Sequence, residues 1–271
     1  MQMTKLVGAV AVVTGAGSGI GRATSLALAN KGCYLALADV NQEGMAQTAA
    51  QLQSLGAKVS QHHVDVSNQE QMAALPTEVE NEYGRINVLV NNAGVELTTM
   101  FEEQSIDDFK WIFGINFWGV IYGCKFFLPI LKQQPEAHIV NVSSMFGFYG
   151  VPSQSSYCAT KFAVRGFTES LRAEMKGTNV GVTCIHPGAI NTNIMRNEKT
   201  MGTVMESQSS KFMRYATAPE KVANKIVKGI ENNSRRVRIG PDSYLSDWLT
   251  RLTPTGFNQL MSMASKALSS S

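Results

Sequence analysis

Cysteine is scarce in this chain, which has four cysteines among 271 residues and no Cys-x-x-Cys pair. Cysteines this few and this far apart argue against a disulfide framework and fit reduced thiols in a cytosolic protein. The histidines show no ligand spacing such as His-Glu-x-x-His, although His62 and His63 are adjacent. We therefore expect no metal site and a cytoplasmic location.

Charge is also sparse, and the net charge is only +3. Nucleic acids and anionic membranes usually attract clustered lysine and arginine, so we expect neither partner. The sequence has one short basic cluster near its end, and we interpret it as a solvated strand end: Arg235, Arg236 and Arg238.

Long hydrophobic runs are missing as well. The most apolar stretch, 113–131, is interrupted by Asn116 and Lys125, and it is typical of a buried helix rather than a membrane span. The apolar run 7–13 lacks the cleavage pattern of a signal peptide and leads into a glycine-rich turn, so we interpret it as a first strand.

Short apolar runs alternate with helix-like segments along nearly the whole chain, at 9–14, 34–38, 88–90, 139–142 and 180–185, with further strands ending at Asp65 and near 239. Continuous apolar runs of this length are typical of strands buried on both faces of a parallel sheet. The alternation predicts an α/β fold in one domain, 1–271: a doubly wound, Rossmann-type parallel sheet of about seven strands with helices on both faces. Ligands of such sheets bind at the carboxyl ends of the strands.

A glycine-rich turn follows the first predicted strand and contains Gly15, Ser18, Gly19, Ile20 and Gly21. Glycines allow a tight turn and let the backbone approach a pyrophosphate, whose charge faces the N-terminus of the next helix. A glycine-rich turn alone is weak evidence, but between a buried strand and a helix, with an acid after the second strand, it predicts a dinucleotide site.

Asp39 is that acid. A carboxylate at this position can accept hydrogen bonds from both ribose hydroxyls of NAD and would repel the 2′-phosphate of NADP. Val40 and Asn41 supply no positive charge for that phosphate. Arg22 could supply one, but we expect its side chain to face solvent or to pack on the sheet. We therefore expect NAD as the cofactor.

Tyr157 and Lys161 lie four residues apart in a predicted helix, so their side chains share one face. A nearby ammonium lowers the pKa of a phenol, and a phenol with a lowered pKa can act as a general acid or base. On its own this pair also fits an ordinary helix face.

With these motifs in place, the chain resembles the short-chain dehydrogenase/reductase family over residues 6–240. The resemblance rests on Thr14-Gly-x-x-x-Gly-Ile-Gly21, Asp65-Val66, Asn91-Asn-Ala-Gly94, Asn116, Ser144, Tyr157-x-x-x-Lys161 and Pro187-Gly188. No catalytic position departs from the family pattern.

The resemblance implies four catalytic residues. Tyr157 would exchange a proton with the alcohol or carbonyl oxygen, and Lys161 would lower its pKa and hold the nicotinamide ribose. Ser144 would hydrogen-bond the reacting oxygen, although the neighbouring Ser143 is an alternative. Asn116 would anchor a water on the proton path, or act as a buried structural amide, or both.

The resemblance also implies a set of cofactor contacts. Asp65 and Val66 would contact the adenine, although Asp65 could instead cap the helix that begins near Gln69. Further contacts to the ribose and the nicotinamide would come from Asn92, Ala93, Gly94, Pro187, Gly188, Ile190 and Thr192.

Methionine and aromatic residues dominate the two segments that would line a substrate pocket, and such side chains make an adaptable apolar wall. The substrate contacts we expect are Ser144, Met145, Gln154, Tyr157 and Met195. Residues 190–218 are long for a connection and predict a substrate lid. An alternative is that these apolar residues only pack the lid.

Residues 241–271 extend beyond the usual end of the family and carry apolar residues at helical spacing. They could cover a second subunit, seal the pocket or lie on a membrane surface, and we expect the subunit contact, in a homodimer or homotetramer.

Together these features predict an NAD-dependent oxidoreductase acting on an apolar secondary alcohol or ketone. The alternatives are a silent dinucleotide-binding regulator and an NADP-dependent carbonyl reductase. An epimerase or dehydratase is less consistent with the chain, because such relatives usually carry a larger C-terminal domain.

Overall fold

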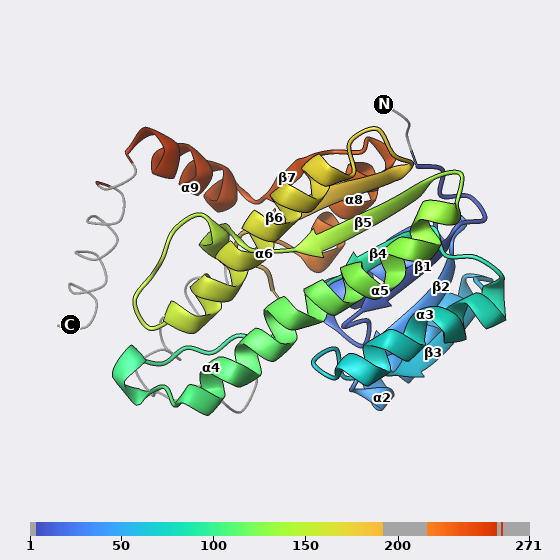
Figure 1. Ribbon diagram of the computed structural model, residues 1–271, viewed down its shortest axis with the longest axis horizontal. Helices are drawn as coiled ribbons and strands as arrows, with labels where there is room; N and C mark the ends of the chain where they lie inside the picture. The colour runs from blue at the N-terminus through green and yellow to red at the C-terminus, as the bar shows by residue number, and fades with distance from the viewer. Residues whose placement is uncertain (1–3, 192–215, 254–255, 257–271) are drawn as a thin grey trace.

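The structure analysed is a computed structural model, and it describes residues 4–191, 216–253 and 256 (Figure 1). Its centre is a sheet whose seven strands are all parallel and lie in the order β3-β2-β1-β4-β5-β6-β7. The strands are β1 (Val10–Thr14), β2 (Tyr34–Asp39), β3 (Val59–His63), β4 (Val88–Asn91), β5 (Ala137–Val142), β6 (Val180–Pro187) and β7 (Arg236–Ile239). This confirms the predicted fold class.

Helices cover both faces of the sheet because the strand residues alternate in direction. Ala11 and Val13 of β1 pack on the core formed with α1 (Gly19–Ala29), α2 (Gln42–Ser54) and α8 (Pro219–Glu231). Val10 and Val12 face the opposite core, formed with α3 (Gln69–Tyr83), α5 (Gly119–Gln133) and α6 (Ser155–Glu174). Strands buried on both sides account for the continuous apolar runs in the sequence.

The long apolar stretch before β5 forms three consecutive helical pieces. These are α4 (Ile106–Phe113), a π-helical turn (Gly114–Trp118) and α5, and short 3₁₀ turns lie at Phe101–Glu103 and Met145–Gly147. The run Ile106–Gln133 is long and apolar enough to cross a membrane, a test that core helices also pass. Phe127 and Leu131 of α5 are fully buried against the sheet.

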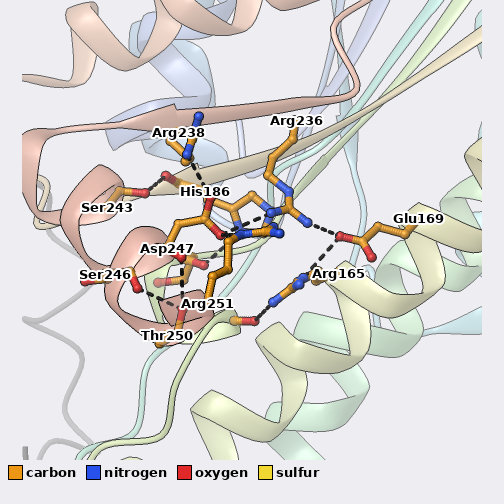
Figure 2. A network of polar contacts seen from close by, with 12 residues as sticks. Arg165, Glu169, His186, Arg236, Arg238, Ser243, Ser246, Asp247, Thr250 and Arg251 are labelled. Atoms are coloured by element: carbon orange, nitrogen blue, oxygen red, sulfur yellow. Dashed lines mark hydrogen bonds and ion pairs between the residues drawn. The ribbon is translucent and has the colours of Figure 1, made fainter. Parts of the chain in front are cut away.

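The C-terminal helix α9 (Pro241–Leu252) is attached to the sheet edge by buried charge (Figure 2). The side chain of Asp247 is 5% exposed and binds Arg236 at 3.2 Å, Arg238 at 2.8 Å and Arg251 at 2.9 Å. Arg236 also pairs with Glu169 of α6. The expectation of a solvated basic cluster was therefore wrong for Arg236 and Arg238, because their partners come from elements that the local sequence does not reveal.

Candidate active site

The sheet brings the predicted motifs to one edge. The chain moves outward from β1 in both directions, through β2 to β3 and through β4 to β7, so β1 and β4 flank the point where strand order reverses. Ligands of doubly wound sheets bind at this point, beside the carboxyl ends of the strands.

The glycine-rich turn between β1 and α1 is tightly folded, and the helix that follows it has no side-chain cap in the described structure. Gly15 and Gly19 have φ angles of +65° and +50°, which favour glycine, and a Cβ on Gly21 would lie 1.9 Å from the carbonyl oxygen of Gly15. Within the described structure the N-cap residue Ser18 makes no side-chain capping bond, and no acid lies in the first turn of α1. Free N–H groups at a helix N-terminus bind phosphate, so this turn fits the pyrophosphate of a dinucleotide.

The segment after β4 is fastened to this turn. The hydroxyl of Thr14 accepts hydrogen bonds from the backbone N–H groups of Asn92 and Ala93, both at 3.0 Å. The Asn92 side chain donates to the carbonyl of Thr14 at 2.9 Å. The residues 92–94 therefore lie beside the glycine turn, as the cofactor interpretation requires.

Asp39 closes the far side of the turn. Its carboxylate accepts from the backbone N–H groups of Gly17 at 2.7 Å and Asn41 at 2.8 Å. The expectation that the Arg22 side chain would face solvent or pack on the sheet was wrong. Its guanidinium donates to Thr48 at 2.9 Å and to the carbonyls of Gly17 and Gly44.

Residues 65 and 66 follow β3. The carboxylate of Asp65 accepts from the backbone N–H and the hydroxyl of Ser67, while Asn68 caps α3. The alternative role of Asp65 as the helix cap is therefore wrong. Val66 is buried, and a Cβ on Gly119 would lie 2.8 Å from its side chain, so Val66 packs tightly against α5.

Tyr157, Lys161 and Ser144 meet at the start of α6. The ammonium of Lys161 lies 5.5 Å from the centre of the Tyr157 ring and donates to the carbonyl of Val142 at 3.2 Å. The Ser144 hydroxyl lowers the pKa of the Tyr157 phenol, so the two side chains are neighbours. All three side chains are buried. The arrangement can hold a substrate oxygen between a hydroxyl donor and a phenol.

The alternative serine has a different partner. Ser143 donates to the backbone carbonyl of Lys161 at 2.8 Å, and a Cβ on Gly147 would lie 2.6 Å from the Ser143 hydroxyl. Ser143 therefore joins the end of β5 to α6, whereas Ser144 contacts the phenol.

Burial controls the ionisation of this group. It raises the pKa of Tyr157, and the Glu96 carboxylate raises it further, while the hydrogen bond from Ser144 lowers it. Burial also lowers the pKa of Lys161 to about 8. The expected lowering of the phenol pKa by Lys161 is not found, because burial of the phenol raises its pKa instead.

Asn116 lies in the π-helical turn and is fully buried. Its side chain accepts from the backbone N–H of Val95 at 2.8 Å and donates to the Val95 carbonyl at 2.9 Å and to Thr160 at 3.2 Å. A Cβ on Gly94 would lie 3.2 Å from the Asn116 amide oxygen and 3.5 Å from the Lys161 ammonium. Asn116 therefore acts as a buried structural amide, and its side chain and the Lys161 ammonium both lie next to Gly94.

The residues expected to hold the nicotinamide follow β6. A Cβ on Gly188 would lie 2.0 Å from the carboxylate of Asp242, which accepts from the N–H of Ala189 at 2.7 Å. Ile190 pairs with Thr217 in a parallel bridge, so the predicted lid begins and ends at the same place. Thr192 and Met195 lie outside the described residues.

Sequence reasoning missed His186, whose ring lies against the backbone of Ser144. Its Nδ1 lies 3.0 Å from the carbonyl oxygen of Ser144, and its ring stacks on Phe148 at 4.3 Å. Ser243 of α9 donates to the His186 carbonyl at 2.8 Å (Figure 2). Only its place before Pro187-Gly188 marks this histidine in the sequence.

Sequence reasoning also missed Glu96, a buried carboxyl that follows β4. The amide of Gln154, which had been expected to contact substrate, donates to Glu96 and to Thr98. The only sign of this residue in the sequence is an acidic side chain between the apolar residues Val95 and Leu97. Across residues 4–191 and 216–253, no three His, Cys, Asp or Glu side chains gather as metal ligands.

Comparison with known proteins agrees with this geometry. The sequence model of the family described as short chain dehydrogenase matches residues 9–202. SadH of Mycobacterium tuberculosis, whose name places it among the oxidoreductases, is 40% identical over 264 residues, which are 96% of each chain. Human estradiol 17-beta-dehydrogenase 11 is 33% identical over 256 residues, 93% of this chain and 81% of the human protein.

A solved structure shares the whole architecture. The crystal structure of a short chain dehydrogenase/reductase from Burkholderia phymatum in complex with NAD has a TM-score of 0.86 and 33% identity, and it covers 92% of this chain and 95% of that chain. The seven-stranded parallel sheet and the family match over most of the chain together identify the protein family. The chain belongs to the short-chain dehydrogenase/reductase family, and it is an oxidoreductase that binds a nicotinamide dinucleotide.

Proposed function

We propose that this protein transfers a hydride between NAD(H) and an apolar secondary alcohol or ketone, with Tyr157 as the general acid and base. The observation that carries the proposal is the buried group of Ser144, Tyr157 and Lys161, in which the Lys161 ammonium lies 5.5 Å from the centre of the Tyr157 ring. This group lies at the edge of the sheet that also carries the glycine-rich turn.

The protein residues donate and accept the proton, while bound NAD or NADH accepts or donates the hydride. In ketone reduction, the neutral phenol of Tyr157 donates its proton to the carbonyl oxygen, and the Ser144 hydroxyl stabilises the charge that develops there. Lys161 stabilises the resulting phenolate. A raised phenol pKa favours reduction at neutral pH, and oxidation of the alcohol should accelerate as the pH rises.

Three observations support NAD over NADP. The Asp39 carboxylate is fixed by the backbone of Gly17 and Asn41 at the end of β2, where a 2′-phosphate would meet its charge. Arg22, the nearest cation of the turn, already donates to Gly17, Gly44 and Thr48. The similar Burkholderia phymatum protein was solved with NAD.

An apolar wall beside the phenol supports an apolar substrate. Phe146 meets the Tyr157 ring edge-on at 6.3 Å, and Met145 and Val151 pack against the buried pair Phe148 and Tyr149. The similar human protein takes its name from estradiol, a largely apolar secondary alcohol.

We also propose a cytoplasmic homo-oligomer. All four cysteines are free and buried, which suits a reducing compartment. The exposed apolar side chains Trp118 of the π-helical turn and Phe162 of α6 are 48% and 41% exposed and offer a self-association surface. Light scattering on the purified protein tests the oligomer, and a monomer would contradict it.

The central test is turnover of secondary alcohols with NAD or NADP, and of the matching ketones with the reduced cofactors, followed by nicotinamide absorbance. Tyr157→Phe should reduce kcat/KM by roughly 100-fold or more, whereas Tyr122→Phe, remote from the site on α5, should not. Turnover that survives Tyr157→Phe would contradict the mechanism. Asp39→Ala combined with Val40→Arg should shift preference toward NADP, and an unchanged cofactor ratio would contradict the role of Asp39.

A further inference from the structure

Three polar side chains form a buried cluster inside the apolar wall of the site. Gln154, directly before α6, donates through Nε2 to the Glu96 carboxylate and to the Thr98 hydroxyl at 3.1 Å. Glu96, Thr98 and Gln154 are 9%, 5% and 7% exposed. Burying a carboxyl and an amide is costly, so a cluster of this kind in an apolar wall calls for an explanation.

The cluster lies next to the reacting phenol. Gln154 precedes Tyr157 by three residues, which is one helical turn, and Leu97, beside Glu96, packs in one cluster with the Tyr157 ring. The Glu96 charge acts on both Tyr157 and Lys161. A substrate whose oxygen lies at Tyr157 would therefore extend past these polar groups.

One hydrogen-bonding atom of the cluster is unused. Gln154 Oε1 is buried and has no hydrogen-bond partner in the described structure. Rotating the amide by 180° would exchange its two ends, and Nε2 would then lack an acceptor instead. Leaving a buried polar atom unpaired destabilises the folded protein. A ligand hydroxyl, which both donates and accepts, satisfies either orientation.

A purely structural role for the cluster is the competing explanation. The two segments are already joined by the backbone hydrogen bond from Thr99 to the carbonyl of Ser153, at 2.8 Å. An apolar pair would pack these segments without the cost of burying a carboxyl. Joining the two segments therefore does not explain why the cluster is polar.

We propose that Glu96 and Gln154 form a polar subsite that binds a second hydroxyl group of the substrate. This inference rests on the proposed function and narrows its substrate class to diols and hydroxy ketones with an apolar frame. The oxygen that reacts lies at Tyr157 and Ser144, and the second oxygen lies at Gln154.

The test compares cyclohexanol with the cyclohexane-1,2-, 1,3- and 1,4-diols in the wild-type protein, using NAD. We expect at least one diol to exceed cyclohexanol about tenfold in kcat/KM, because a site built to bind a hydroxyl discriminates against an analogue that lacks it. Gln154→Met and Glu96→Met keep similar side-chain volumes and should reduce this diol-to-alcohol ratio to near one. Ser156→Ala, a buried polar change on the same helix, should leave the ratio unchanged.

The outcomes separate the two proposals. Wild-type protein that does not discriminate, or a ratio that both methionine variants leave intact, overturns the subsite while the dehydrogenase function stands. Absence of turnover with any of these compounds and either cofactor overturns the function. Thermal shifts of the Tyr157→Phe protein with NADH and each diol then decide the subsite alone. A shift lost with Gln154→Met supports it, and equal shifts for diol and cyclohexanol refute it.

Discussion

Two buried histidines should make the stability of this protein sensitive to mild acid. His138 and His186 are 0% exposed, and burial lowers the pKa of His138 to about 3 and that of His186 to about 4. The ordinary pKa of histidine is 6.5. Below that pH these two histidines bind protons in the unfolded chain but stay neutral in the folded chain. The stabilisation is complete above pH 6.5 and is lost as the pH falls toward the folded values.

The size of the effect follows from these pKa values. Between pH 7 and pH 5, each histidine should lower the free energy of unfolding by about 2 kcal/mol. Together they should lower it by about 4 kcal/mol, which corresponds to a decrease of roughly 10 °C in Tm. Because His186 lies 3.0 Å from the Ser144 carbonyl, its protonation should also disturb the catalytic serine.

The assay is thermal unfolding at several pH values between 5 and 7. His138→Gln and His186→Gln should each remove about half of the excess pH dependence, even though each lowers Tm at pH 7. His63→Gln is the matched control, because His63 is exposed and its replacement should leave the slope unchanged. If the wild type and the double variant His138→Gln, His186→Gln show the same slope, the reasoning is refuted.

Other changes should act on single features of the site. Glu96→Gln should move the alkaline rise of alcohol oxidation to lower pH, because the Glu96 carboxylate raises the pKa of Tyr157; an unmoved pH profile would contradict this coupling. Asp247→Asn should cost about 3 kcal/mol, seen as a lower Tm, because the partly buried Arg236 and Arg238 lose the charge of their buried partner. Since pairing lowers the pKa of Asp247, its stabilisation is present above the ordinary carboxyl pKa and lost as the pH falls through the folded value, so wild type and variant should converge in strong acid; a constant difference would argue against pairing. Gly21→Ala should weaken NAD binding at least tenfold in fluorescence titrations, whereas Gly166→Ala, with open space at its Cβ, should not; equal affinities would disprove the close approach at Gly15.

Much of the fold could be predicted from the sequence because the information is local. Strands buried on both faces appear as continuous apolar runs, and the glycine-rich turn requires glycine through backbone geometry alone. The spacing of Tyr157 and Lys161 on one helix is likewise a local property, and the structure places Ser144 beside them.

The rest depends on contacts between distant segments. The pKa of Tyr157 follows from burial, which no spacing in the sequence reports. Arg236 of strand β7 pairs with Glu169 of helix α6 and with Asp247 of helix α9. Arg22 donates to the carbonyl of Gly44 in the neighbouring helix α2, and this contact is also visible only in three dimensions.

The π-helical turn at Gly114–Trp118 also constrains how this chain can change in length. Such a turn holds one residue more than an α-helical turn, and each residue rotates a helix by about 100°. Deleting one residue there would restore a regular α-helical turn and leave the later side chains of α5 facing the sheet, whereas one further inserted residue would rotate them by about 100°. Surface loops tolerate insertions and deletions, so among relatives we expect chain length to vary in the loops and to differ between α4 and α5 by no more than the one extra residue of the π-helical turn.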